Sequence, residues 1–240
     1  MTIDVQKLKV EFIEKIERTG SVSSFRFRPE KRIDFLPGQF LQIFFDDEHI
    51  KNRSLNKYLS FSSAPERQYI EVTKRISDSS FSKRLLLLRK GDKVSIKAPM
   101  GSCIFEPSMP KLCFLAGGIG ITPVISIIEH VALNSLKNDI RLIYSNRSDE
   151  DIAFKKELDA WSSQSSNIKV TFLVSDKKSQ NIDLHKGFIN KDLLTEFISD
   201  FCQRKFFIFG PPAMVEDMKN ICYDIGCKNK NVCTENFIGY

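Results

Sequence analysis

The chain has 240 residues, more than most single domains, so two domains with separate cores are expected. Its content of 42% hydrophobic and 28% charged residues is typical of a soluble globular protein. The first residues, MTIDVQKLKVEF, lack the apolar segment of a secretory signal, and the chain has no repeat or low-complexity tract.

The net charge of +6 is unevenly distributed. Residues 1–107 hold 20 Lys and Arg against 14 Asp and Glu, whereas residues 108–240 hold 16 of each kind. The first part is therefore expected to meet an anion, which could be a phosphate-bearing cofactor, an acidic protein or nucleic acid. No nucleic-acid motif accompanies the charge, so nucleic acid ranks last. The alternative is a solvated basic surface.

The six cysteines contain no Cys-x-x-Cys pair. Cys222, Cys227 and Cys233 have a spacing typical of neither zinc nor iron–sulfur sites, so no metal is expected. The pattern favours reduced structural thiols in a cytoplasmic protein.

Up to about residue 107, short apolar segments alternate with turn signals such as Pro37-Gly38 and Gly91-Asp92. We predict strands at residues 9–16, 22–28, 39–45, 58–62, 69–76 and 93–97. Such a series favours an antiparallel β-barrel. One helix is expected within it, capped by Ser79 or Ser80, with the leucines of residues 85–88 on its apolar side.

A proline-containing linker, residues 105–110, separates this part from an alternation of strands and helices. Strands are predicted at residues 112–115, 140–144, 169–174 and 205–209 and from Val232, and helices from Pro123 and at residues 153–161, 191–198 and 213–225. The alternation predicts a parallel sheet covered by helices on both faces. The expected domains are residues 1–107 and 108–240.

The sequence KLCFLAGGIGITPVISIIE, residues 111–129, raises three possibilities: a membrane span, a core segment or a phosphate-binding turn. Its uncharged run is barely long enough for a bilayer, and glycines and Pro123 interrupt it. A strand, a glycine turn and a helix N-terminus fit better, because bare backbone N–H groups there bind a diphosphate. The glycines of the turn, Gly117, Gly118 and Gly120, are expected to permit positive φ and to let a ligand approach the backbone. A glycine turn that binds nothing is an even alternative, but Gly210-Pro211 opens a second helix at the same expected sheet edge and favours a nucleotide site.

Taken together, the ordered motifs resemble the ferredoxin–NADP reductase superfamily, especially its single-chain reductases of ferredoxins and oxygenases and its flavin reductases. The resemblance covers nearly the whole chain and rests on Pro37-Gly38-Gln39-Phe40, Lys57-Tyr58-Leu59-Ser60-Phe61-Ser62-Ser63, Gly91-Asp92, Gly117-Gly118-x-Gly120-x-Thr122-Pro123, Gly210-Pro211-x-x-Met214 and Glu235-x-Phe237. It implies a flavin-binding barrel, holding FAD rather than FMN, followed by an NADP- or NAD-binding domain.

The resemblance places the first flavin motif, Arg-x-Tyr/Phe-Ser, on Lys57, Tyr58, Leu59 and Ser60. Lysine then replaces the arginine that holds the flavin diphosphate. Lysine is a point charge and cannot form the bidentate hydrogen bonds that arginine makes to a phosphate. Leu59 replaces the aromatic residue that packs on the flavin ring. Tyr58 is not expected to substitute, because neighbouring strand residues point to opposite faces. Ser60 matches the hydroxyl near the reactive flavin nitrogen.

The second flavin segment is expected to line the ribityl chain and to offer backbone N–H groups to the diphosphate. Its residues are Thr73, Lys74, Arg75, Ser79, Ser80, Phe81 and Ser82. Lys74 and Arg75 occupy adjacent strand positions, so one of them is expected to be solvated.

For the nicotinamide nucleotide, the resemblance implies a diphosphate turn, a ribose site after the second strand and a second helix start. These residues are Gly117, Gly118, Gly120, Thr122, Pro123, Ser145, Asn146, Arg147, Phe209, Gly210, Pro211 and Met214. Arg147, assisted by Lys177 and Lys178, could pair with a 2′-phosphate, which slightly favours NADP. Phe209 stands where the family often has a cysteine.

Glu235 and Phe237 match an acidic and an aromatic residue beside the flavin, with Tyr240 as an alternative stacking residue. The expected catalytic residues are Ser60, Thr122 and Glu235. The three histidines form no evident catalytic pair and are interpreted as structural.

The sequence therefore predicts a cytoplasmic, FAD-dependent oxidoreductase that takes hydride from NAD(P)H and passes electrons to a separate, acidic redox protein such as a ferredoxin or an oxygenase component. One alternative is a flavin reductase with diffusible flavin, which Lys57 and Leu59 would suit. Another is a non-catalytic electron-transfer subunit. No membrane span or nucleic-acid partner is expected.

Overall fold

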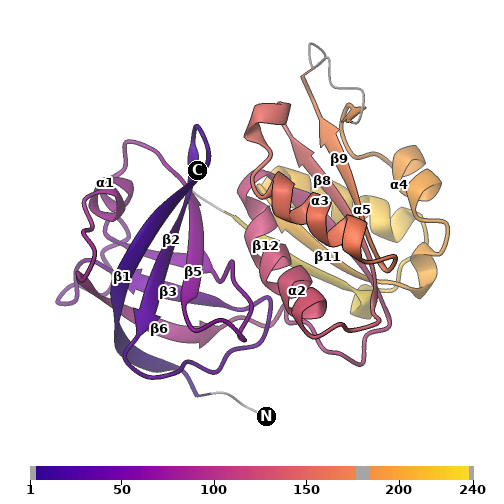
Figure 1. Cartoon of the computed structure of the whole chain (residues 1–240). Helices are drawn as coiled ribbons and strands as arrows, with labels where there is room; N and C mark the ends of the chain where they lie inside the picture. The colour runs from indigo at the N-terminus through magenta and orange to yellow at the C-terminus, as the bar shows by residue number, and fades with distance from the viewer. Residues whose placement is uncertain (1–3, 177–183, 238–240) are drawn as a thin grey trace.

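The computed structural model describes residues 4–176 and 184–237, which form two domains that lie side by side (Figure 1). The first domain is a six-stranded antiparallel sheet of order β4-β3-β6-β1-β2-β5. Its strands are β1 (Gln6–Thr19), β2 (Val22–Pro29), β3 (Phe40–Phe44), β4 (Asn56–Ser60), β5 (Ile70–Arg75) and β6 (Lys93–Met100). A bridge between Phe61 and Val72 joins the two edges, so the sheet closes into the predicted barrel.

Alternating apolar residues fill the barrel interior, because inward and outward side chains alternate along each strand. Phe35 and Phe61 stack there with ring centroids 3.8 Å apart. The short helix α1 (Ser80–Leu86) inserts Phe81 and Leu85 into this core. Ser79 caps it by accepting a hydrogen bond from the backbone N–H of Ser82, so the predicted serine cap is found at Ser79.

The second domain is a six-stranded parallel sheet of order β10-β9-β8-β7-β11-β12. Its strands are β7 (Lys111–Gly117), β8 (Asp139–Asn146), β9 (Ile168–Val174), β10 (His185–Lys186), β11 (Lys205–Gly210) and β12 (Val232–Asn236). The sequence missed β10, because two residues are too short to show a pattern.

Helices cover both faces of this sheet, as predicted. Residues of α2 (Thr122–Leu133) and α3 (Lys155–Gln164) pack on one face, and those of α4 (Lys191–Phe197) and α5 (Pro212–Asp224) pack on the other. Short 3₁₀ turns complete the domain: η1 (Gly118–Ile121), η2 (Asp149–Asp151), η3 (Phe201–Gln203) and η4 (Asn229–Asn231). No helix among the described residues is long and apolar enough to cross a membrane.

Polar contacts join the two domains. Arg18 of the barrel donates to Glu71 of the barrel at 2.9 Å and to Glu157 of α3 at 2.5 Å. Arg67 forms an ion pair of 2.6 Å with Glu129 of α2, and the Ser126 hydroxyl donates to the Ser63 carbonyl. The arrangement fixes helices α2 and α3 against the barrel.

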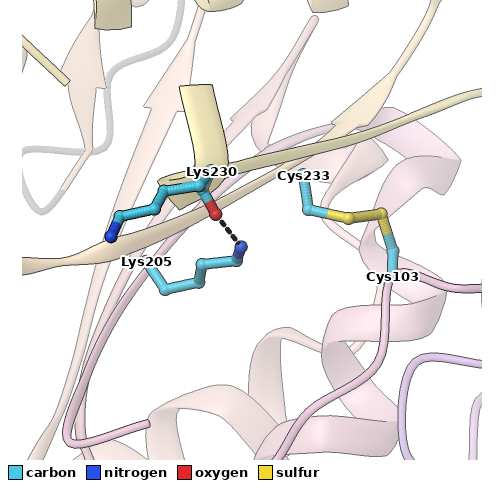
Figure 2. Close-up of a disulfide and its surroundings, with 4 residues drawn as sticks. All are labelled: Cys103, Lys205, Lys230 and Cys233. Atoms are coloured by element: carbon cyan, nitrogen blue, oxygen red, sulfur yellow. Dashed lines mark hydrogen bonds between the residues drawn. A yellow bond between two sulfur atoms is a disulfide. The ribbon is translucent and has the colours of Figure 1, made fainter. Parts of the chain in front are cut away.

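One sequence expectation about the cysteines is wrong. Cys103, in the segment that leaves the barrel, forms a disulfide with Cys233 of β12 across 130 residues, with a Cα–Cα distance of 5.9 Å (Figure 2). The pairing could not be predicted from spacing, because the fold and not the sequence brings the two residues together. The other four cysteines are free thiols, of which only Cys202 is exposed.

Candidate active site

A cavity of about 1180 Å³ lies between the outer face of the barrel and the end of β12. It is lined by Phe40, Gln42, Ile50, Lys51, Arg53, Asn56, Lys57, Tyr58, Leu59, Ser60, Lys97, Thr234, Glu235, Asn236 and Phe237. Six of the predicted site residues therefore meet here although they come from the barrel and from the last strand: Lys57, Tyr58, Leu59, Ser60, Glu235 and Phe237. The volume is ample for a large cofactor.

Tyr58 and Leu59 both line the cavity, but they differ in exposure. Leu59 pairs with Leu41, and its side chain belongs to the barrel core, whereas Tyr58 pairs with Gln42 and is 61% exposed on the cavity side. The Tyr58 ring meets Phe40 edge to face, with centroids 5.8 Å apart. Leu59 therefore contributes both to the cavity wall and to the barrel core, whereas Tyr58 is the more exposed aromatic surface of the cavity.

Cations dominate the charge of the cavity. Lys51, Arg53, Lys57 and Lys97 line it, and among the described residues Glu235 is the one carboxylate in the lining. On the neighbouring strand, burial and then the charge of Lys57 lower the pKa of Lys74, which is only 5% exposed. Because two ammonium groups held within reach of each other favour an anion nearby, this wall suits a phosphate-bearing ligand.

The expectation that either Lys74 or Arg75 is solvated is also wrong. Lys74 is buried and donates from Nζ to the Arg75 carbonyl at 2.8 Å. Arg75 is half-buried, and its guanidinium approaches the glycine turn, with Nη2 3.7 Å from the position that a Cβ on Gly118 would take. Arg75 therefore reaches towards the second domain.

Glu235 is the acidic group of the cavity. Burial raises the pKa of its carboxyl from 4.5 to about 7, and no hydrogen bond or ion pair to it occurs among the described residues. It lies beside Phe40 and the Gly101 backbone, because its Oε1 is 3.6 Å from the position of a Cβ on Gly101. Such a carboxyl changes protonation state near neutral pH.

The other predicted flavin residues lie outside the lining of this cavity. Thr73 is buried, and its hydroxyl contacts the hydroxyls of Ser24 and Ser62 at 2.6 and 2.7 Å. Ser82 is buried in a hydroxyl cluster with Ser77 and Ser79 at the start of α1. Ser80 is exposed at the first helical position, whereas the Phe81 ring fills the barrel core, which leaves only its backbone for a ligand.

The predicted nucleotide residues meet at the carboxyl edge of the parallel sheet. Gly117 ends β7 beside Ser145 of β8, and Gly210 ends β11 beside Asn236 of β12. Of the three glycines in the turn, only Gly118 has a positive φ, of 52°, so positive φ does not explain glycine at Gly117 and Gly120. A Cβ on Gly120 would lie 2.3 Å from the Phe209 carbonyl oxygen, and one on Gly117 would lie 2.2 Å from Sδ of Met214. Gly120 thus requires glycine for close packing against β11, whereas a side chain at Gly117 would meet the flexible end of Met214.

Two of the residues predicted at this edge use their side chains within the protein. The hydroxyl of Thr122 is buried and donates to the Ile119 carbonyl at 3.1 Å, so it holds the turn together instead of facing the cavity. The Phe209 ring is fully buried in the core of the second domain. Pro123 is buried in the first turn of α2, whereas Pro211 is exposed before α5.

The segment after β8 carries an unusual buried amide. Asn146 is 6% exposed, and neither its Oδ1 nor its Nδ2 has a hydrogen-bond partner of good geometry among the described residues. It lies beside the Tyr144 hydroxyl, which donates to the Gly118 carbonyl at 3.0 Å. Ser145 is half-buried and Arg147 is exposed. A buried amide without partners is costly, so a polar ligand at this edge would satisfy it.

Comparison with known sequences identifies both halves. Residues 7–105 match the family described as the oxidoreductase FAD-binding domain, and residues 114–220 match the oxidoreductase NAD-binding domain. The chain belongs to the ferredoxin–NADP reductase superfamily. It is an NAD(P)H-dependent flavoprotein oxidoreductase by family, as the motifs predicted.

Curated relatives include NADH-cytochrome b5 reductase 1 of Aspergillus clavatus, which is 26% identical over 230 residues, covering 90% of this chain and 74% of the relative. The enzyme of the same name from Ajellomyces capsulatus is 27% identical over 237 residues, covering 94% of this chain and 76% of the relative.

Among solved structures, the FAD/NAD-binding domain of nitric oxide dioxygenase from Vibrio cholerae has a TM-score of 0.83 at 21% identity, covering 96% of this chain and 98% of that one. The cytochrome b5 reductase domain of Ulva prolifera nitrate reductase has a TM-score of 0.83 at 22% identity, covering 96% and 97%. These two similarities show a shared fold.

The residues present fit both cofactors of the superfamily. The cavity combines aromatic side chains for a flat ring with cations for a diphosphate, which is the chemistry of FAD. The carboxyl edge combines tightly packed glycines with the unsatisfied amide of Asn146, which suits a dinucleotide. The expected Lys177, Lys178 and Tyr240 lie outside the described residues.

Proposed function

We propose that this protein takes hydride from NAD(P)H onto FAD held in the cavity between the barrel and β12, and passes electrons to a separate redox protein. The supporting observation is the cavity itself, since Tyr58, Lys57 and Glu235 converge there next to the carboxyl edge of the nucleotide domain. Bound FAD would supply the chemistry, because it accepts two electrons as hydride and returns them singly.

The chain's own side chains would hold this cofactor in two parts. Tyr58, which already meets Phe40 edge to face, offers an exposed aromatic surface for the flavin ring. Lys57 and the neighbouring Lys74 offer positive charge for the diphosphate, and the serine cluster at the start of α1 follows a few residues after Lys74. Ser60, buried on the cavity side of β4, contributes a hydroxyl near the ring.

Glu235 would hold a proton at its carboxyl close to the flavin. With a pKa of about 7, the group exchanges a proton near neutral pH, which suits a relay between the site and solvent. Thr122 no longer has a catalytic role in this proposal, because its hydroxyl donates to the Ile119 carbonyl.

The donor would bind across the glycine turn, with its adenosine ribose near Asn146 and Arg147. The relatives named above are described as NADH enzymes, which supports NADH as a donor. The exposed guanidinium of Arg147 supports NADPH, because it can bind a 2′-phosphate through two charge-assisted hydrogen bonds. The variant Arg147→Ala distinguishes the two donors, because only NADPH carries the 2′-phosphate that this guanidinium would bind.

The acceptor would be a protein with an acidic surface. The barrel part of the chain carries the whole net charge of +6, and the relatives named above act with cytochrome b5 according to their names. We expect turnover with such an acceptor to fall as salt screens the encounter, while turnover with a small neutral dye changes much less. Equal salt sensitivity with both acceptors would remove the docking argument.

Flavin retention tests the proposed site. The purified protein is expected to be yellow and to keep FAD through gel filtration, and Lys57→Ala is expected to lower the retained fraction without changing the fold. Lys90→Ala, which removes an exposed lysine of the same barrel outside the cavity lining, is the matched control. Unchanged FAD occupancy in Lys57→Ala would disprove the diphosphate placement.

A protein that loses its flavin completely on gel filtration, yet reduces added flavin, would instead be a flavin reductase. That alternative has lost part of its support, because an aromatic residue, Tyr58, does face the cavity.

A further inference from the structure

The disulfide between Cys103 and Cys233 links the two parts of the chain that form opposite walls of the proposed flavin cavity. Cys103 follows the last barrel strand by three residues, and its carbonyl packs against Gly38, where a Cβ would lie 2.3 Å away. Cys233 lies in β12, one residue before the cavity-lining run of residues 234–237.

Strand β12 is an edge strand of its sheet: it is paired with β11, and no strand of residues 4–176 or 184–237 lies on its other side. Three further contacts restrain it. Lys205 donates to the Lys230 carbonyl just before the strand (Figure 2), the disulfide holds the middle, and the Phe237 N–H donates to the Gly210 carbonyl at 2.9 Å beyond its end. Of these three, the disulfide joins β12 to the segment that leaves the barrel.

The alternation along β12 puts Cys233 and Glu235 on the same side of the strand. Both face the segment of residues 101–103, since Glu235 lies near Gly101 and Cys233 is bonded to Cys103. The disulfide therefore holds the acidic wall of the cavity against the barrel.

We propose that this disulfide is a redox-controlled clamp: the oxidised form fixes β12 against the barrel, and reduction releases the strand and loosens the cavity. The effect on the cavity rests on the proposed flavin site, whereas the clamp itself concerns only the attachment of β12 to the barrel.

The reductant is a dithiol, either small or carried by a thiol–disulfide oxidoreductase. Its thiolate attacks Sγ of Cys233, which is half-buried, whereas Cys103 is 3% exposed. The attack breaks the bond between the two sulfurs, forms a mixed disulfide at Cys233 and releases Cys103 as a thiolate that takes up a proton. The second thiol of the dithiol then displaces Cys233, so two electrons and two protons reach the protein and the reductant becomes a disulfide.

The experiment compares the oxidised protein, the same protein after dithiothreitol, and the variants Cys103→Ser and Cys233→Ser, with Cys202→Ser as the control that removes an exposed free thiol. Titration of denatured protein should find four thiols before reduction and six after it. Without flavin, hydrogen exchange at the amides of residues 232–236 should speed up at least tenfold on reduction and in both serine variants, and not in Cys202→Ser.

In the presence of FAD, reduction should weaken flavin binding about tenfold, and dithiothreitol should have no effect on the Cys233→Ser variant. Six thiols in the unreduced protein, or equal exchange of β12 in both redox states, would overturn the clamp. An oxidised protein that binds no FAD would overturn the proposed function instead, because the exchange experiment judges the clamp without flavin.

Discussion

The two edges of the parallel sheet differ in how their polar side chains are paired, although buried polar atoms that lack a hydrogen bond among the described residues occur at both, including Oδ1 of Asp139 at the amino edge. At the amino edge, the Arg204 side chain is 1% exposed and donates five hydrogen bonds, to the side chains of Asp139 and Asp200 and to the carbonyls of Leu112 and Asp139. At the carboxyl edge, the Asn146 amide has no hydrogen-bond partner of good geometry in the part of the chain that the structure describes, and Arg147 is exposed.

The difference shows where the fold is stabilised and where it is prepared for a ligand. Arg204 joins strands β7 and β8 to the start of β11, so its bonds are used within the protein. The glycines, the unsatisfied amide and the raised pKa of Glu235 lie at the other end, where strands of open sheets present ligand sites. Conservative changes should therefore affect stability at one edge and cofactor binding at the other.

The largest expected effect is on stability at the amino edge. Arg204→Ala should lower the free energy of unfolding by about 3–5 kcal/mol, because Asp139 and two carbonyls lose their bonds to the buried guanidinium and Asp200 keeps only its bond from Lys111. The matched change at the other edge, Arg147→Ala, should cost less than about 0.5 kcal/mol, since that side chain is exposed. Urea unfolding of both variants measures the two losses of unfolding free energy. Equal losses would contradict the assignment of stability to the amino edge.

The two edges should also give opposite pH dependences. The pKa of Glu235 is about 7 in the folded protein, whereas its ordinary value, expected in the unfolded chain, is 4.5. Between these two pH values the unfolded chain has lost the proton and the folded protein still holds it, so the free energy of unfolding falls as pH rises. The total loss of unfolding free energy is on the order of 3 kcal/mol and is complete above pH 7. Glu235→Gln should abolish this pH dependence.

At the amino edge, burial opposes the ionisation of Asp200, but hydrogen bonds from Arg204 and Lys111 outweigh it and lower its pKa from 3.8 to about 2. Its contribution is fully present above pH 3.8 and is lost as pH falls through about 2. Unfolding free energies of the wild type, Glu235→Gln and Asp200→Asn across this range test both signs. A Glu235→Gln profile that still falls between pH 4.5 and 7 by the same amount would count against the assignment.

Coenzyme choice should respond to Arg147 alone at the carboxyl edge. Arg147→Ala should weaken NADPH binding by about 1.5–3 kcal/mol, the scale of hydrogen bonds to a charged group, and leave NADH nearly unaffected. Steady-state kinetics with both coenzymes measures it. Parallel losses, or no loss at all, would show that Arg147 does not read the 2′-phosphate.

The smallest expected effect comes from the glycine turn. Gly120→Ala should cost about 1–3 kcal/mol of stability, because its Cβ would meet the Phe209 backbone at 2.3 Å and push η1 away from β11. Nucleotide binding should weaken with it. Gly20→Ala, where a Cβ meets nothing within 4 Å, is the control and should be neutral. Unchanged stability in Gly120→Ala would show that η1 can move away from β11 at little cost in free energy, which would contradict the prediction.

Sequence patterns predicted the fold well, because both periodicities are strong in this chain. Alternation along residues such as Leu41 and Ile43 indicated the barrel, and apolar runs such as residues 112–115 indicated the buried parallel strands. The same alternation would have found the cavity residues Phe40 and Gln42, which lie between the core positions of β3.

The errors arose where the fold decides what a side chain meets. Tyr58 and Leu59 differ by one strand position and both line the cavity, and only their pairing with β3 shows which one is exposed and which one also packs in the core. The glycines were expected to permit unusual backbone angles, but Gly117 and Gly120 relieve contacts with residues almost one hundred positions away. Lys51 and Arg53 come from a loop without a recognisable pattern, and Cys103 meets Cys233 across 130 residues.

The most direct test of the central claim is anaerobic reduction of the flavin-loaded protein by NADH and by NADPH, followed through the visible absorbance of FAD. We expect one equivalent of at least one of these coenzymes to bleach one equivalent of bound FAD, and Gly120→Ala to require a higher coenzyme concentration than Gly20→Ala for the same rate. A protein that holds stoichiometric FAD but is bleached by neither coenzyme would contradict the account.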